Sequence, residues 1–148
     1  MPTTKVVPKS KATGPNPKDI IGAQKISITK IPSTALLHEA HAMMNGGIKY
    51  DPYNWRAKPV QASIYVDAAL RHLFDWFEGA EYASDSDVHH LGHARACLGI
   101  LLDCLETGNL IDDRPICGNP DKFNQLQETL AARFKKWLSE YEKKRATK

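Results

Sequence analysis

Residues 88–105 carry the pattern that most restricts how this chain can fold, because they are apolar on more than half of a helical circumference. Large apolar side chains recur there at helical spacing, and the stripe they form is widened by three further apolar residues: Val88, Leu91, Leu98, Leu102 and Leu105, with Ala94, Cys97 and Leu101. Such a helix needs cover on most sides, so the pattern predicts a central helix. Because the helices of one chain cannot cover it fully, a homodimer or homotetramer is expected.

Three further segments have the apolar spacing of helices, namely residues 33–45, 60–79 and 121–138. The first of them starts at Ser33, a favourable N-cap, and is expected to stop at Gly46-Gly47. The sequence contains no internal repeat and no alternation of strands with helices. It therefore predicts an all-α fold with four main helices.

The segments outside these helices are less regular. Asp85 or Ser86 is expected to cap the central helix, and the alternation in residues 25–31 indicates a short extended stretch. Residues 1–18 are rich in Pro, Lys, Thr and Ser with almost no apolar pattern, which predicts a disordered basic arm. Residues 19–148 are then expected to form a single all-α domain.

Charge is distributed unevenly along the chain. The first thirty residues hold six lysines and a single acid, Asp19, whereas residues 75–87 carry five acids and no Lys or Arg. Basic ends around an acidic middle suit an anionic ligand that is held through a cation, although a solvated surface gives the same count.

The cysteine content and the hydropathy restrict the location of the protein. Three cysteines occur, without metal-knuckle spacing and with no apolar leader before them, which indicates a reduced, cytoplasmic compartment. No stretch approaches the ~20 continuous apolar residues of a membrane span, so no membrane association is expected.

Carboxylates gather on and after the segment 60–79. Spacings of four, four and three place Asp67, Arg71, Asp75 and Glu78 on one helical stripe, which is commonly a solvent-facing ladder of ion pairs. If the helices pack as a bundle, however, several acids could converge as hard oxygen ligands for Mg²⁺ or Mn²⁺. The predicted metal ligands are Glu39, Asp67, Glu78, Glu81 and Asp85.

Histidines accompany these acids. His72 lies beside the stripe, and His90 shares a helical face with Ala94, so it points toward the core, where a satisfied structural histidine is the commoner outcome. Glu81 or His72 could act as general base, with His90 orienting the site from the core. The spacing of His89 and His93 matches zinc-binding helices but lacks the accompanying Glu, so it is a weak zinc signal.

Cations, amides and indoles around the acidic cluster indicate a nucleotide ligand. Lys and Arg fit phosphate oxygens, Asn can pair with a base edge, and Trp can stack on a base. The predicted substrate-binding residues are Lys49, Asn54, Trp55, Arg56, Arg71, Trp76 and Arg114. Neither a phosphate loop of the Gly-x-x-x-x-Gly-Lys type nor a Gly-x-Gly-x-x-Gly motif is present, which argues against a P-loop or dinucleotide enzyme.

Five spaced blocks resemble the phage dATP/dGTP diphosphohydrolase N-terminal family. They are "NPKDIIGAQK" at 16–25, "GGIKYDPYNWR" at 46–56, "SIYVDAALRHLFDWFEG" at 63–79, "DSDVHHLGHARA" at 85–96 and "GNLIDDRP" at 108–115. That family looks akin to the MazG-like all-α nucleoside triphosphate pyrophosphatases, and its phage members include the MazZ type that accompanies 2-aminoadenine genomes. The resemblance therefore implies a MazG-like helical bundle.

The resemblance also implies a reaction. A purine deoxynucleoside triphosphate, dGTP or dATP, is hydrolysed to the monophosphate and pyrophosphate with Mg²⁺ held by helix carboxylates within an oligomer, in the host cytoplasm. This chain departs from the family pattern in two places, where "GED" reads Gly79-Ala80-Glu81 and "SG" reads Ser86-Asp87. It also has only Glu39 where MazG proteins carry paired glutamates.

Two other functions are compatible with the sequence. A phosphohydrolase of the His-Asp metal class would release intact triphosphate, but no adjacent His-Asp pair is present. A non-catalytic nucleic-acid-binding module would use the basic ends and bind DNA in a salt-sensitive manner. The acidic middle argues against it, so no stable nucleic-acid partner is expected.

Overall fold

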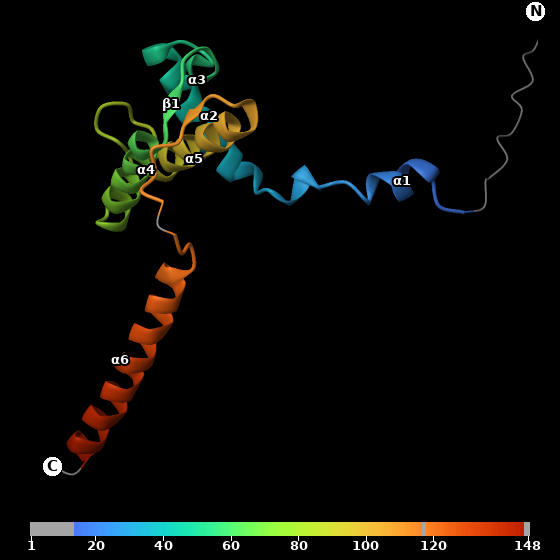
Figure 1. Cartoon of the computed structure of the whole chain (residues 1–148). Helices are drawn as coiled ribbons and strands as arrows, with labels where there is room; N and C mark the ends of the chain where they lie inside the picture. The colour runs from blue at the N-terminus through green and yellow to red at the C-terminus, as the bar shows by residue number, and fades with distance from the viewer. Residues whose placement is uncertain (1–13, 117, 147–148) are drawn as a thin grey trace, which may run out of the picture.

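The computed structural model describes residues 14–116 and 118–146, and it is all-α with four long helices, as predicted (Figure 1). These helices are α2 (Ser33–Tyr50), α4 (Ala62–Phe77), α5 (His90–Thr107) and α6 (Lys122–Ala146). Shorter elements are α1 (Pro17–Gly22), the 3-10 helix η1 (Ile28–Lys30), α3 (Asn54–Ala57) and the strands β1 (Val60–Gln61) and β2 (Leu110–Ile111). Residues 1–13 of the predicted arm lie outside the described residues. In the described part of the chain, no helix is both long and apolar enough to cross a membrane.

Helix α5 lies between α2 and α4, in the central position that its sequence predicts. Apart from His90, the residues that it buries are small: Gly92, Ala94, Ala96 and Cys104. A Cβ atom added at Gly92 would stand 2.6 Å from the backbone oxygen of His38 on α2. Small residues therefore allow the two helix backbones to approach closely, which larger side chains would prevent.

Helix α2 does not stop at Gly46-Gly47 as predicted but continues to Tyr50. Two glycines in a helix cost only about 1 kcal/mol each, and packing against α5 supports the segment. The helix ends just before Pro52, because a proline disfavours helical geometry in the residue that precedes it. That residue, Asp51, adopts a φ of 73°. The extension carries Lys49 past the glycines and toward α5.

Helix α5 begins at His90, so the predicted caps Asp85 and Ser86 are wrong. The preceding residues form a tight loop in which the Asp87 amide donates to the Ala83 carbonyl at 2.8 Å and Asp87 has a φ of 56°. The cap is His89, whose Nδ1 accepts a hydrogen bond from the Leu91 amide at 3.0 Å. The loop places Asp85 beside the end of α2 instead of at the start of α5.

Two loops contain short helices that periodicity did not predict. The segment 25–31, expected to be extended, contains the 3-10 helix Ile28–Lys30, because it has no neighbouring strand to pair with. In the turn after α2, residues 54–57 form α3, which packs against α5. The helix α3 positions Asn54 and Trp55 next to the central helix.

The amino end of α4 is capped from a distant part of the chain. The carboxylate of Asp113 accepts hydrogen bonds from the Ser63 amide at 2.9 Å, the Ser63 hydroxyl at 2.5 Å and Gln61 Nε2 at 2.7 Å. These bonds lower the pKa of Asp113 to about 2. The parallel pair β1–β2, with Val60 opposite Leu110, brings the two segments together. Asp113 thus satisfies helix donors that have no partner within α4.

Much apolar surface is left uncovered in the single chain. The stripe of α5 that sequence assigns to the core is largely exposed, with Leu98 at 48%, Leu102 at 65% and Leu105 at 52%. Helix α6 stands apart from the three-helix body, and all its residues are exposed, including its apolar positions Phe134 and Trp137 (Figure 1). The chain therefore packs through the small-residue face of α5 and leaves the leucine face open.

We predict that Gly92→Ala destabilises the protein by about 1–3 kcal/mol, because the added methyl group meets backbone that a side-chain rotation cannot move away. Gly46→Ala is the matched control, since the added Cβ has nothing within 4 Å and the exchange removes a helix-interior glycine. It should raise stability by about 0.5–1 kcal/mol. Urea unfolding followed by circular dichroism measures both, and equal effects of the two exchanges would contradict the close contact.

Asp113→Asn should lower the melting temperature at pH 7 and reduce its loss in acid. The folded-state pKa of Asp113 is lowered from 3.8 to about 2, so its contribution to stability is present above the ordinary pKa and is lost as the pH falls toward 2. Melting temperatures from pH 7 to pH 2 test this, with Asp67→Asn, at an exposed position on α4, as control. Parallel pH profiles of Asp113→Asn and the wild type would overturn the prediction.

Candidate functional site

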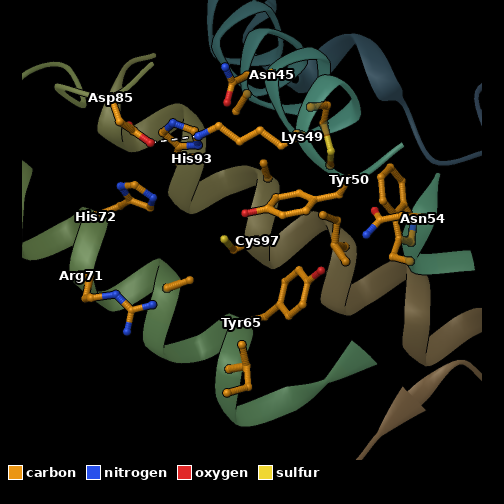
Figure 2. A pocket seen from close by; sticks show the side chains of 18 residues that line it. Asn45, Lys49, Tyr50, Asn54, Tyr65, Arg71, His72, Asp85, His93 and Cys97 are labelled. Carbon is orange, nitrogen blue, oxygen red and sulfur yellow. Dashed lines mark hydrogen bonds and ion pairs between the residues drawn. The ribbon is translucent and has the colours of Figure 1, made fainter. Parts of the chain in front are cut away.

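A cavity of about 490 Å³ lies between α2, α3, α4 and α5. Its charged and imidazole side chains group at one end, and these are Lys49, Arg71, His72, Asp85 and His93 (Figure 2). Tyr50, Asn54 and Tyr65 lie away from that end (Figure 2), and Asn45 and Trp55 also line the cavity. A cavity of this size with few converging polar groups is typical of a small-molecule site.

Lys49 and Asp85 form the ion pair at the charged end. The ammonium of Lys49, on the last turn of α2, donates to Asp85 Oδ2 at 2.9 Å (Figure 2). The hydrogen bond to Lys49 lowers the pKa of Asp85, and the same bond raises the pKa of Lys49. Both groups are therefore charged at neutral pH. The cavity presents one cation and one carboxylate within reach of the same ligand.

Two imidazole rings stand next to this pair. His72 on α4 stacks on His93 on α5, with ring centroids 4.4 Å apart and an interplanar angle of 11°. Burial lowers the pKa of both rings, and that of His93 falls to about 4, with further lowering of each ring by a neighbouring imidazole. His93 Nε2 also lies 3.2 Å from the hydroxyl oxygen of Ser86. Both rings are neutral at physiological pH and able to accept a proton or a metal.

His72 also belongs to a group that could hold a metal ion. Ligand atoms of His72, Asp75 and His90 all lie within 4.8 Å of one another, and this is the group of that kind found among the described residues. His90 is 5% exposed, and its Nδ1 lies 2.9 Å from Nδ1 of His72. The histidine predicted to orient the site from the core is therefore buried directly behind a cavity-lining ring.

The structure does not bring the five predicted metal-binding carboxylates together. Three of them pair with different basic side chains: Glu39 accepts from Arg95 at 2.8 Å, Glu81 lies 3.1 Å from His89 Nε2, and Asp85 pairs with Lys49. The other two, Asp67 and Glu78, are exposed on and just after α4. Asp85 lines the cavity, and the other four do not.

The predicted substrate-binding residues divide in the same way. Four of them line the cavity: Lys49, Asn54, Trp55 and Arg71. Arg56 instead forms a bidentate pair with Asp103, at 2.7 and 2.8 Å, and the indole N–H of Trp55 donates to the same carboxylate at 2.8 Å. Arg114 pairs with Asp112 at 2.6 Å, and Trp76 is 38% exposed outside the cavity. Arg56 and Asp103 fasten α3 to α5, which holds Asn54 and Trp55 in place.

Two of the predicted catalytic residues lie at the charged end and one does not. His72 lines the cavity, and His90, which does not line it, contacts the His72 ring. Glu81 lies outside the cavity, beside His89. Sequence reasoning missed Asn45 and Tyr65 as lining residues and Asp75 as a companion of the histidines. The spacing of three between His72 and Asp75 could have indicated the last of these, since it places both side chains on one helical face.

Comparison with known proteins assigns the chain to a family. The sequence profile of the dATP/dGTP diphosphohydrolase N-terminal family matches residues 15–114. The chain therefore belongs to the dATP/dGTP diphosphohydrolase N-terminal family, and the matched residues contain α2, α3, α4, α5 and the whole cavity lining. The family's description supports a hydrolase activity. No curated protein and no solved structure matches the chain.

Proposed function

We propose that the protein hydrolyses a purine deoxynucleoside triphosphate, dGTP or dATP, to the monophosphate and pyrophosphate. The observation that carries this proposal is the cavity, whose cations gather at one end while Tyr50, Asn54 and Tyr65 lie toward the other. Family membership supplies the class of substrate. We also propose a role in phage nucleotide metabolism for a modified-purine genome, and this part of the proposal rests on the sequence resemblance alone.

The two ends of the cavity suit the two ends of such a nucleotide. Lys49 and Arg71 provide the positive charge that a triphosphate needs, and a guanidinium can bind phosphate oxygens in a bidentate manner. Tyr50 and Tyr65 offer rings against which a purine can stack, and Asn54 offers an amide for its edge. We therefore propose that the triphosphate lies toward α4 and the start of α5, with the base near α3.

A magnesium ion fits the donor chemistry of the charged end. Mg²⁺ in nucleotide enzymes is commonly bound by one or two carboxylates together with substrate phosphates and water, and Asp85 is the carboxylate that lines the cavity. When bound there, the ion would neutralise triphosphate charge. Asp85 would hold the ion once Lys49 has exchanged this carboxylate for a phosphate group of the substrate.

The proposed reaction is attack of water on the α-phosphorus. A bond forms between the water oxygen and phosphorus, and the bond from phosphorus to the oxygen that bridges the α and β phosphates breaks. The water proton passes to a base, for which the cavity offers the neutral rings of His72 and His93, whereas Glu81 lies outside it. Lys49 and Arg71 stabilise the charge on the departing pyrophosphate.

One observation favours a second candidate function. His72, Asp75 and His90 form a mixed histidine and carboxylate group within 4.8 Å, although no His-Asp pair is adjacent in the sequence. Enzymes that hydrolyse nucleotides with metals bound by His and Asp release intact triphosphate in one step. The two candidates therefore differ in the inorganic product and can be separated by identifying it.

The test is incubation of the full chain with dGTP or dATP, with Mg²⁺ or with EDTA, followed by anion-exchange analysis of the products. We expect dGMP or dAMP with pyrophosphate, formed only when the metal is present. Triphosphate together with the nucleoside would favour the second candidate. Absence of any product, together with salt-sensitive DNA binding, would overturn the enzyme assignment.

Substitutions can locate the activity in the cavity. Lys49→Met should lower kcat/KM by roughly 10²- to 10³-fold, because a cation that faces the developing charge is lost. Arg56→Met should change kcat/KM much less and lower the melting temperature, since this guanidinium pairs with Asp103 outside the cavity. Lys58→Met, at an exposed lysine outside the cavity, is the control. Equal losses for Lys49→Met and Lys58→Met would move the site elsewhere.

We also propose that a second copy of the chain covers the exposed leucine face of α5. In the single chain Leu98 is 48% exposed, Leu102 65% and Leu105 52%, so the described elements leave this face uncovered. Leu98, Leu102 and Leu105 form a continuous apolar stripe, which is the kind of surface that obligate homo-oligomers bury.

Leu102→Glu should shift the protein toward monomer in size-exclusion chromatography with light scattering, because a charge would be buried at the centre of the interface. The wild type is expected to run as a dimer or tetramer. Lys58→Glu places the same side chain on an exposed loop and serves as control. A monomeric wild type, or an unchanged mass for Leu102→Glu, would overturn this interface.

A further inference from the structure

The cluster of His72, Asp75 and His90 has features that the proposed nucleotide chemistry does not explain. His72 and Asp75 project from one face of α4, and His90 is the first residue of α5. Nδ1 of His72 lies 2.9 Å from Nδ1 of His90, and Asp75 Oδ2 lies 3.8 Å from that same His90 nitrogen. Three potential ligand atoms thus converge where the end of one helix meets the start of another.

The separations suit ligands of a shared ion. Metal bonds of about 2.05 Å put the ligands of a tetrahedral ion about 3.3 Å apart. In an octahedral ion with the same bond length, adjacent ligands lie about 2.9 Å apart and opposite ligands about 4.1 Å apart. The two imidazole nitrogens could instead share one proton, but that hydrogen bond does not account for the position of Asp75 beside them. At 3.8 Å the carboxylate is too far from His90 for a hydrogen bond, and its distance falls within the range for a common ligand sphere.

The surroundings hold the two rings in position. His90 is buried at 5% exposure, and its backbone amide donates to the Glu81 carbonyl at 3.0 Å. The ring of His72 is stacked on His93, which fixes its plane. The Asp75 side chain is 56% exposed, so it has room to rotate toward an ion. Two fixed nitrogens and one adjustable carboxylate form a site whose geometry exists before binding.

From this geometry we propose that His72, Asp75 and His90 form a binding site for a divalent transition metal, with Zn²⁺ or Mn²⁺ preferred over Mg²⁺. Two imidazoles and one carboxylate are ligands that first-row transition metals take, whereas Mg²⁺ strongly prefers oxygen donors. This site is distinct from the carboxylate Asp85 at the nucleotide-binding end. His93 is not a ligand in this arrangement, so its ring stays available to the cavity. The inference concerns metal binding and holds whichever inorganic product the enzyme releases.

The test uses the untagged full chain, stripped of metal with EDTA, desalted, and studied without nucleotide. After incubation with Zn²⁺, Mn²⁺ or Mg²⁺ and gel filtration, elemental analysis gives the bound equivalents, and the shift in melting temperature reports binding to the folded state. We expect one equivalent of Zn²⁺ or Mn²⁺ per chain and none of Mg²⁺. In the Co²⁺-loaded protein, visible absorption bands should report nitrogen ligation.

Substitutions assign the ion to the cluster. Asp75→Asn changes an exposed side chain without altering its shape, and it should weaken Zn²⁺ binding by more than the roughly 10- to 100-fold that the loss of an outer-shell partner costs. His72→Ala should do the same and also change the Co²⁺ spectrum. His41→Ala, at an exposed histidine on α2, is the matched control and should bind like the wild type.

Two outcomes would overturn the site. The first is a wild type that takes up no Zn²⁺ or Mn²⁺, and the second is equal uptake by the wild type, Asp75→Asn and His72→Ala, which would put the ion elsewhere. Both are independent of dGTP hydrolysis, because no nucleotide is present. A protein that hydrolyses dGTP with Mg²⁺ but fails this test would retain its function and lose only this metal site.

Discussion

Close contact between the backbones of α2 and α5 is the constraint on which the remainder of the structure depends. At Gly92 the separation leaves no room for a side chain, since even a Cβ atom would lie 2.6 Å from the His38 carbonyl oxygen. This contact fixes the position of α5 relative to α2, and α4 also packs against α5. The cavity lies between these three helices and α3, so its shape follows from how closely they approach.

The site combines groups from segments that are distant in the sequence. The last turn of α2 contributes Lys49, α4 contributes Arg71 and His72, and the loop before α5 contributes Asp85. Two of these positions depend on a local detail: α2 continues past two glycines to carry Lys49, and the Asp87 turn delays the start of α5 and places Asp85. Fixed elements can hold such groups with little reorganisation, which is what electrostatic stabilisation of a charged reaction requires.

Charged residues that line the cavity differ in their ion-pair partners from charged residues that hold its walls together. Arg56 and Arg71 have the same side chain, yet the first is paired with Asp103 on α5 and the second lines the cavity. The acids divide likewise, because Glu39 is held by Arg95 while Asp85 faces the cavity with Lys49. The charge inventory of the sequence was therefore informative about the ligand class but not about which member of each set faces the ligand.

Periodicity in the sequence by itself determined the all-α class, the four long helices and the central place of α5, because a helix with a wide apolar face must be covered. The chemistry of the side chains indicated a nucleotide site, in which the predicted residues Lys49, Asn54, Trp55, Arg71 and His72 line the cavity. The other predicted substrate-binding residues, Arg56, Trp76 and Arg114, do not line it. Only the tertiary structure decided that α5 buries mainly small residues and that Leu98, Leu102 and Leu105 are exposed. It likewise decided that His72, Asp75 and His90 converge and that the predicted carboxylates do not. The reason is physical: spacing along a helix fixes the face a side chain occupies, whereas the distance between faces depends on how closely the helices pack.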